Sequence, residues 1–180
     1  MLKGKTAVVT GGSRGIGKAI CLKFAENGAD IAFLYAGNTV KAEETVKELE
    51  GLGVKAKAYQ CNVADADAVA AVIKEIVKDF GGIQILVNNA GVCRLGSFLD
   101  MSDEDRDFHI DINIKGVWNV TKAVLPEMIA RKDGRIVMMS SVTGDMVADP
   151  GETAYALTKA AIVGLTKSLA VEYAQSGILR

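Results

Sequence analysis

Short apolar runs alternate with longer segments of helical period along the whole chain. The runs are rich in β-branched residues and too continuously apolar for a strand with one face in water, so they favour a parallel sheet covered on both faces. They predict strands at residues 6–10, 30–34, 55–61, 83–88 and 135–140. The segments between them predict helices at residues 15–27, 40–52, 66–80, 103–131 and 153–175.

The ends of these helices carry their own signals. Glycines stand where a left-handed residue would terminate four of them, at Gly28, Gly53, Gly81 and Gly177. Pro126 lies inside the fourth helix, where we expect a kink or a local break. No Pro-rich or Ser-rich linker divides the chain, so the alternation predicts one α/β domain over residues 1–180, a Rossmann-type doubly wound parallel sheet.

A glycine-rich turn connects the first predicted strand to the first predicted helix. It reads Thr10, Gly11, Gly12, Ser13, Arg14, Gly15, Ile16 and Gly17. In a doubly wound sheet this turn presents backbone amides to a phosphate. Gly11 would permit the tight turn, Gly15 the approach of a pyrophosphate, and Gly17 the close packing of helix on strand. A strand-to-helix turn without a ligand is the alternative interpretation.

Composition narrows the classes of partner. The net charge is −1 and the charges are interspersed, which argues against nucleic-acid or anionic-membrane binding. We see no signal-peptide pattern and no stretch of about twenty apolar residues, so we expect no membrane partner. Cys21, Cys61 and Cys93 are too widely spaced for a disulfide framework or a metal site, and we expect them to be buried apolar side chains in a reducing, cytoplasmic compartment.

Two further motifs complete a family pattern. Asn88, Asn89, Ala90 and Gly91 follow the fourth predicted strand, and Tyr155 and Lys159 form a Tyr-x-x-x-Lys motif. With the glycine turn, they resemble the short-chain dehydrogenase/reductase family over residues 3–177. Up to Gly91 the chain is most similar to bacterial 3-oxoacyl-[acyl-carrier-protein] reductases. From Val92 it is closer to a less well-defined group of bacterial oxidoreductases in the family, so a chimeric chain is an alternative.

The resemblance implies an enzyme that transfers hydride from NADPH to a carbonyl. The leading substrate class is the 3-oxoacyl thioesters of fatty acid biosynthesis. Another small ketone or alcohol as substrate, or a truncated nucleotide-binding module without catalysis, remains open.

The resemblance also assigns catalytic roles. Tyr155 matches the general acid, and Ser141 matches the hydroxyl that orients the substrate oxygen. Lys159, one helical turn beyond Tyr155, would favour the phenolate, lower its pKa and bind the nicotinamide ribose. Asn113 matches an asparagine whose helix-interrupting carbonyl holds a water of the proton relay.

Alternatives remain for three of these positions. Ser140 competes with Ser141, which we prefer because the family serine precedes a V-x-G segment, here Val142 to Gly144. Asn113 could be a helix-surface amide. His109, the only histidine, we assign to helix packing or the surface, since no array of acids or cysteines suggests a metal site.

Cofactor choice depends on the end of the second predicted strand. From Tyr35 to Asn38 there is no carboxylate to repel a 2′-phosphate, and Arg14 can supply a bidentate cation. We therefore predict NADP(H) rather than NAD(H). In the family pattern Asn62 and Val63 border the adenine, and the ribose side of the site is lined by Asn89, Ala90 and Gly91.

The family pattern extends beyond this chain and beyond a monomer. Relatives continue into a sixth strand, a nicotinamide loop, a substrate lid and a seventh strand, so we expect the last strands and the lid to be missing and the strand near Met138 to form an edge. The resemblance also implies a homo-oligomer, a dimer or tetramer, through helices 103–131 and 153–175. Residues suited to that surface, if not to burial against the sheet, are Trp118, Val124, Ala161, Leu165 and Leu169.

Overall fold

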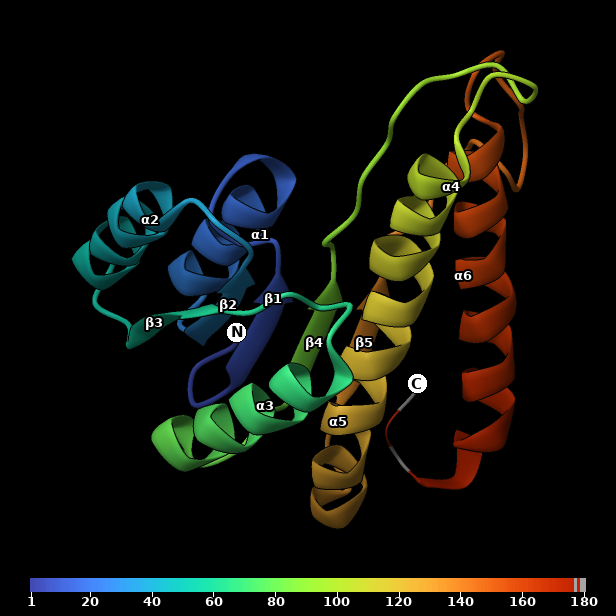
Figure 1. Ribbon diagram of the computed structural model, residues 1–180. Coiled ribbons are helices and arrows are strands. Elements are labelled where there is room, and N and C mark those ends of the chain that lie inside the picture. Colours follow the sequence, from blue (N-terminus) through green and yellow to red (C-terminus); the bar gives the residue numbers. More distant parts are fainter. Residues whose placement is uncertain (177, 179–180) are drawn as a thin grey trace.

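The computed structural model describes residues 1–176 and 178 and shows a parallel sheet between layers of helices (Figure 1). The strands are β1 (Thr6–Thr10), β2 (Asp30–Tyr35), β3 (Ala56–Gln60), β4 (Ile85–Asn88) and β5 (Arg135–Met138). Their order is β3-β2-β1-β4-β5, and every neighbouring pair is parallel. The predicted doubly wound α/β fold is therefore confirmed.

The helices follow the predicted order with one irregularity. They are α1 (Gly15–Glu26), α2 (Thr39–Gly51), α3 (Ala66–Phe80), α4 (Asp103–Ile110), η1 (Asp111–Gly116), α5 (Val117–Arg131), α6 (Thr153–Glu172) and η2 (Ala174–Ser176). The predicted helix 103–131 is one helical path in which the π-helical segment η1 joins α4 to α5. The predicted helix 153–175 ends earlier, and a short 3-10 turn, η2, follows it.

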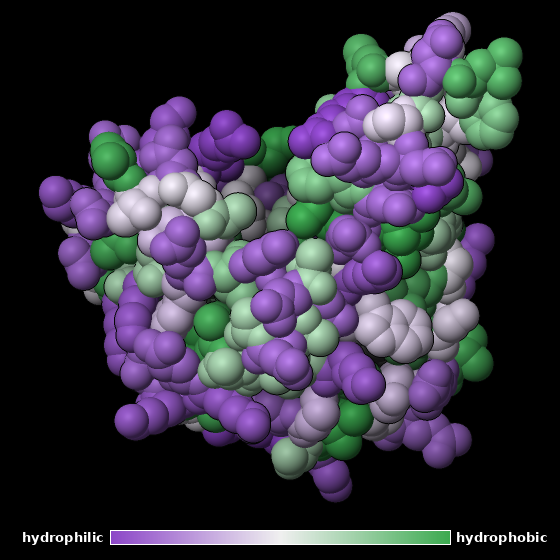
Figure 2. Space-filling model, in the orientation of Figure 1, coloured by the Kyte–Doolittle hydropathy of each residue, from purple (hydrophilic) through white to green (hydrophobic). Residues whose placement is uncertain are grey.

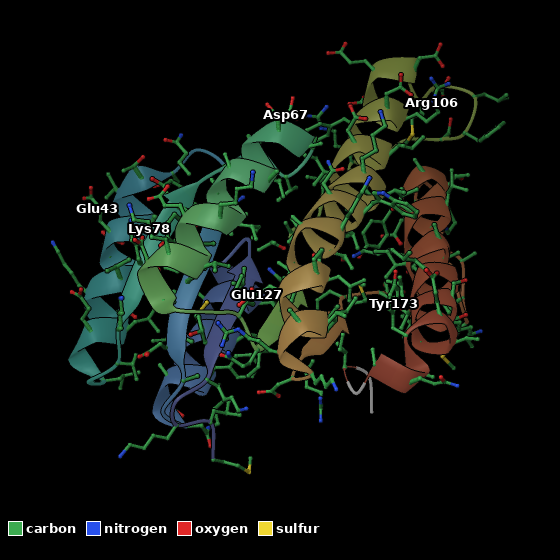
Figure 3. All side chains as sticks on the ribbon, turned by 90° about the horizontal axis from the view of Figure 1, so that it is seen from below. Glu43, Asp67, Lys78, Arg106, Glu127 and Tyr173 are labelled. Atoms are coloured by element: carbon green, nitrogen blue, oxygen red, sulfur yellow. The ribbon has the colours of Figure 1, made fainter. Side chains whose placement is uncertain are left out.

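Two apolar clusters hold the layers on the two faces of the sheet. On one face Cys21 of α1 and Leu49 of α2 belong to a cluster with Phe33 of β2. On the other face α3 and α5 pack against alternate strand residues such as Leu86. Tyr173, just beyond α6, packs against this second cluster and lies on the side that faces α5 (Figure 3).

Helix termination agrees with the glycine signals. Gly28, Gly53 and Gly81 have φ values of 90°, 81° and 80°, in the left-handed region that glycine tolerates best. Gly177 lies outside the described residues. Helix α5 also ends in the left-handed conformation, at Lys132 with φ of 53°, and no glycine in the sequence marked this end.

The break expected at Pro126 is absent, since α5 runs through it to Arg131. A proline inside a helix removes one hydrogen bond. In α5 the neighbouring Val124, Leu125 and Met128 are buried in the core, and their packing holds the helix on the sheet. The departure from α-helical geometry occurs instead at η1.

Exposure differs from expectation for one cysteine. Cys21 and Cys61 are buried as predicted, but Cys93 is exposed, because it lies on the loop between β4 and α4 rather than on a helix or strand.

Helix α6 bears on the expectation that the chain has no long apolar stretch. It is long and apolar enough to cross a membrane, with a mean hydropathy of 1.2, so the expectation that no such stretch exists is wrong. Length and composition are weak evidence for a span, because a core helix of a soluble protein meets the same test. Here α6 contacts α4 and η1, and it carries the buried polar residues Thr158 and Lys159.

The sheet has two edge strands among the described residues, β3 and β5. β5 pairs with β4 on one side, and Val137 of β5 is 45% exposed. The strand near Met138 therefore forms an edge, as the family pattern implied.

Candidate functional site

The glycine turn after β1 is closed by backbone contacts. The N–H groups of Gly11 and Gly12 donate to Leu34 O at 2.8 and 3.2 Å, and Gly11 has φ of 71°. A Cβ at Gly17 would lie 2.2 Å from Gly11 O, so only glycine allows α1 to start this close to the turn. The tasks expected of Gly11 and Gly17 fit this geometry.

Sequence reasoning gave Gly12 no task, yet it is equally constrained. A Cβ at Gly12 would lie 2.5 Å from Phe33 Cβ. The contact partner lies in the next strand, so the local motif alone did not reveal it.

The beginning of α1 is open enough for a phosphate. Gly15 has φ of 56°, and among the described atoms a Cβ there would meet nothing within 4 Å. Arg14 is the extended N-cap residue, and within residues 1–176 and 178 its side chain makes no capping hydrogen bond. Arg14 and Ile16 are exposed and Ser13 is half-buried. The first N–H groups of α1 thus suit the pyrophosphate of a dinucleotide.

The loop after β4 is fastened to this turn by Thr10. Thr10 Oγ1 accepts hydrogen bonds from the N–H groups of Asn89 and Ala90 at 3.0 and 2.9 Å, and Asn89 Nδ2 donates to Thr10 O at 2.9 Å. Thr10 is buried, so these bonds lie away from water. Sequence reasoning missed Thr10, whose only signal is its place at the end of β1.

Lys159 and Tyr155 lie together at the other end of the site. Lys159 Nζ lies 5.5 Å from the centre of the Tyr155 ring and donates to Met139 O at 2.6 Å. Lys159 is 5% exposed, and this burial lowers the pKa of its ammonium group. Tyr155 is half-buried, so neither side chain is an ordinary surface residue.

The two neighbouring serines have different partners. Ser140 Oγ donates to Lys159 O at 2.9 Å, so its proton is engaged in joining β5 to α6. Ser141 Oγ accepts from Thr143 N at 3.2 Å, which leaves its own proton to donate to a substrate. This geometry favours Ser141 over Ser140.

Asn113 lies in η1 and is completely buried, so the surface-amide alternative is wrong. Its Oδ1 accepts from Val92 N at 2.8 Å, and its Nδ2 donates to Val92 O at 2.9 Å and Thr158 Oγ1 at 3.0 Å. Thr158 Oγ1 in turn donates to Tyr155 O at 2.8 Å. Asn113 therefore connects the loop after β4 with the turn of α6 that carries Tyr155 and Lys159. π-helical turns of this kind are frequent at functional sites.

Gly91 closes the gap between these groups. A Cβ at Gly91 would lie 3.4 Å from Asn113 Oδ1 and 3.6 Å from Lys159 Nζ. The Gly91 backbone therefore passes directly beside the ammonium group.

The adenosine side is built from the ends of β2 and β3. Tyr35 ends β2, and Asn38 caps α2 by accepting from Lys41 N at 3.0 Å, so no carboxylate intervenes between β2 and α2. Asn62 is exposed, whereas Val63 is buried and its O accepts from Asn119 Nδ2 at 3.0 Å. The two residues thus follow β3 with one side chain toward solvent and one held against α5.

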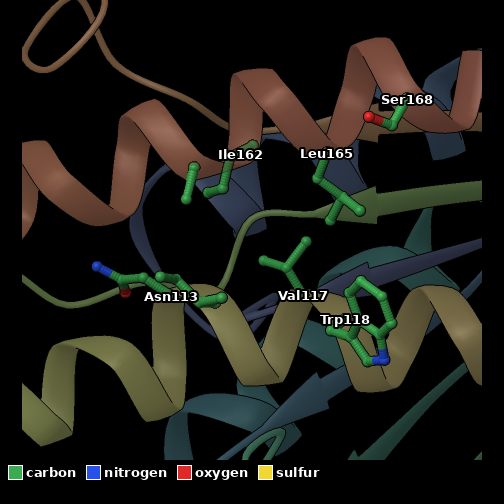
Figure 4. A pocket seen from close by; sticks show the side chains of 8 residues that line it. Asn113, Val117, Trp118, Ile162, Leu165 and Ser168 are labelled. Carbon is green, nitrogen blue, oxygen red and sulfur yellow. The ribbon is translucent and has the colours of Figure 1, made fainter.

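A groove of about 330 Å³ runs between α6 and the path of η1 and α5 (Figure 4). Asn113 lies at one end, Val117 and Trp118 line one wall, and Ile162 and Leu165 line the other. Trp118 is 55% exposed and Ala161 is exposed, whereas Val124 is fully buried against the sheet and cannot serve an intersubunit surface.

The described part of the chain has no candidate metal site. Among residues 1–176 and 178, no three His, Cys, Asp or Glu side chains are grouped to hold a metal ion.

Comparison with known sequences gives matches along almost the whole chain. The sequence model of the family described as short chain dehydrogenase matches residues 5–179. The oxidoreductase UcpA of Escherichia coli K12 is 70% identical over 177 residues, which are 98% of this chain and 66% of that protein. The 3-oxoacyl-[acyl-carrier-protein] reductase FabG of Staphylococcus aureus is 48% identical over 174 residues, 97% of this chain and 70% of that protein. The chain thus spans about two thirds of the length of these relatives, and UcpA matches on both sides of Gly91.

Solved structures give the same result. An NAD⁺-bound xylitol dehydrogenase matches with a TM-score of 0.95 at 35% identity, over 99% of this chain and 68% of that one. A mutant short-chain dehydrogenase/reductase from Serratia marcescens matches with a TM-score of 0.93 at 37% identity, over 98% of this chain and 71% of that one.

Proposed function

Because the chain belongs to the short chain dehydrogenase family, we propose that it binds NADP(H) and transfers hydride between this cofactor and the carbonyl carbon of a small substrate. The observation that carries the proposal is the position of Lys159, which lies 5.5 Å from the Tyr155 ring and bonds to Met139 and Ser140, directly before Ser141. The Gly91 backbone, in the loop that Thr10 fastens to the glycine turn, passes beside the same ammonium group. A 3-oxoacyl thioester is the first substrate to test, on the similarity to FabG. Other small ketones and alcohols come next, since UcpA is named only as an oxidoreductase.

The residues present fit a dinucleotide. The open start of α1 offers N–H donors to the pyrophosphate, and Gly15 leaves room for it. Asn62 and Val63 would border the adenine, and Asn89, Ala90 and Gly91 the ribose side. The exposed Arg14 and the absence of an acid between Tyr35 and Lys41 support NADP(H), although a structural relative is named with NAD⁺.

The nicotinamide, when bound, supplies or accepts the hydride. In the direction of reduction, Ser141 Oγ donates a hydrogen bond to the carbonyl oxygen, and the Tyr155 hydroxyl gives that oxygen its proton as the carbonyl carbon gains hydride. The Lys159 ammonium stabilises the phenolate that remains. Asn113 and Thr158 hold this turn of α6 in place through Tyr155 O.

We also propose that the protein is a homo-oligomer that associates through α5 and α6. The groove between these helices is apolar, and Figure 2 shows hydrophobic surface along the same boundary. In a homo-oligomer, a second copy of the chain would cover the apolar residues of α6.

The decisive experiment follows NADPH oxidation with an acetoacetyl thioester and with a panel of small ketones. Tyr155→Phe should lower kcat/KM by about 10² to 10⁴, because it removes only the proton donor. NADPH affinity, measured by fluorescence beside NADH affinity, should change less than about twofold. Tyr59→Phe is the matched control, since the Tyr59 hydroxyl bonds to Asp79 at 2.7 Å beside the edge strand β3 and should be dispensable for turnover.

Two results would change the assignment. Undiminished turnover by Tyr155→Phe would remove Tyr155 from catalysis. NADPH binding by the wild type without turnover of any carbonyl would favour the second candidate, a nucleotide-binding module.

A further inference from the structure

His109 is fully buried in α4 and lies one helical turn before Asn113. Its Nε2 lies 2.9 Å from Arg94 N and its Nδ1 lies 2.7 Å from Asp105 O. The Arg94 amide can only donate and the Asp105 carbonyl can only accept. These two partners therefore fix a neutral ring with its proton on Nδ1 and with Nε2 as an acceptor.

Arg94 is held by α4 in two further ways. Its guanidinium pairs with the Asp105 carboxylate, and its Cζ lies 4.0 Å from the centre of the Phe108 ring. The carboxylate lies beside this guanidinium, which lowers the pKa of Asp105. Backbone and side chain of one loop residue are thus held by three residues of α4, which lie within little more than one helical turn.

Asn113 and His109 act on alternate residues of the same segment. Asn113 holds Val92 through both its N–H and its carbonyl, and His109 holds the N–H of Arg94. Residues 91–97 form no helix or strand of their own, so side chains replace the hydrogen bonds that a neighbouring strand would give.

This segment runs along the reactive end of α6. Gly91 passes beside Lys159 Nζ, and Gly96 N donates to Gly151 O at 3.0 Å, close to where α6 begins. In Figure 1 the loops that precede α4 and α6 meet at the same end of the molecule.

We propose that His109 is a positioning residue that fixes the segment Val92–Arg94 as one wall of the substrate space above Tyr155. The inference rests on the proposed function, because the wall matters only if a substrate occupies that space. Without the Nε2 acceptor, the Arg94 amide would lose its partner in a part-buried hydrogen bond, and the segment would shift or fluctuate. Substrate binding would weaken while Tyr155, Lys159 and the glycine turn remain in place.

The test compares His109→Gln with His109→Leu. A glutamine Oε1 can reach the place of Nε2 and accept from Arg94 N, whereas leucine fills a similar volume and accepts nothing. His109→Leu should raise the KM of the carbonyl substrate about tenfold and leave kcat and NADPH affinity within about threefold. His109→Gln should keep the KM close to the wild-type value. Val124→Ala serves as the control, because it destabilises a buried site in α5 that does not touch the loop.

Hydrogen exchange at the Arg94 amide supplies a readout that needs no activity. Exchange should accelerate about tenfold or more in His109→Leu and stay slow in His109→Gln, with the Val92 amide less affected because Asn113 holds it. Equal hydrogen-exchange rates at the Arg94 amide in all variants would show that His109 does not hold this amide. Faster exchange with unchanged KM, or an equal KM increase in Val124→Ala, would overturn the positioning role. A wild type without turnover would count against the proposed function alone. Hydrogen exchange at the Arg94 amide would then decide whether His109 holds this amide.

Discussion

Lys159 is tied to the end of β5 by two hydrogen bonds, one to Ser140 and one to Met139. The Ser140 hydroxyl binds the Lys159 carbonyl, and the Lys159 ammonium binds the Met139 carbonyl. These two bonds fix the segment that follows β5, directly before Ser141, relative to α6. The arrangement keeps an ammonium group largely buried, which stabilises the folded state less than an apolar side chain would. Function and stability are therefore opposed at Lys159.

This opposition predicts a pH dependence. Burial lowers the pKa of Lys159 in the folded state below the ordinary value of 10.5, so between the two values the unfolded chain binds more protons. Wild-type stability should then rise with pH through this window. Lys159→Met lacks the group, so its stability relative to wild type should be most favourable at neutral pH and decline as pH approaches 10.5. Its turnover should fall about hundredfold or more.

Urea denaturation at several pH values from 7 to about 10 measures the difference. The lost bond to Met139 O adds an offset of about 1 kcal/mol that does not depend on pH, so the slope is the test. Lys167→Met changes an exposed lysine of the same helix. A parallel pH response in both variants would contradict the prediction.

At the residue scale, sequence reasoning found the groups that lie within one motif. Gly11 and Gly17 were predictable because their constraints arise inside the turn. Gly12 and His109 were not, because their partners Phe33 and Arg94 belong to other segments. A motif records what neighbouring residues require of each other, whereas a tertiary contact leaves no mark on the local pattern.

The same distinction applies to whole elements. The predicted strand 83–88 is longer than β4, which begins at Ile85, because Ile83 is buried outside the ladder and an apolar pattern reports burial rather than pairing. The continuous helical period of 103–131 did not indicate η1, and only the family resemblance pointed to an interruption at Asn113. No break occurs at Pro126, because local propensity is weaker than the packing of α5 on the sheet.

The end of α5 supports a prediction about stability. Lys132 adopts the left-handed backbone conformation. For a residue with a side chain this conformation is roughly 1 kcal/mol less favourable than for glycine. Lys132→Gly should therefore raise the free energy of unfolding by about 0.5 to 1 kcal/mol. Lys122→Gly, at an exposed position inside the same helix, should lower it by about 1 kcal/mol. Thermal or urea unfolding measures both, and a loss of stability in Lys132→Gly would show that this lysine makes a compensating contact.

For the whole molecule, the expectation that the strand near Met138 forms an edge came from the family resemblance, because periodicity predicts elements without saying which ones are neighbours. The resemblance also singled out the apolar surface of α5 and α6. It could not tell which apolar residues face outward. Val124 is buried in the core, whereas Trp118 and Ala161 are exposed. Only the packed structure separates these two uses of an apolar side chain.

Leu165 offers the sharpest test of association. It lines the groove between α5 and α6 and is half-buried, so it can reach a second copy without being part of the sheet core. Leu165→Glu would place a charge on this apolar surface, and desolvating that charge opposes assembly. The variant should remain folded by circular dichroism but weaken self-association at least tenfold, seen by light scattering as a shift toward the monomer mass. Lys167→Glu introduces the same side chain on α6 outside the groove and should keep the wild-type mass. If both variants assemble like the wild type, this face of α6 is not the interface, and another surface must account for any oligomer.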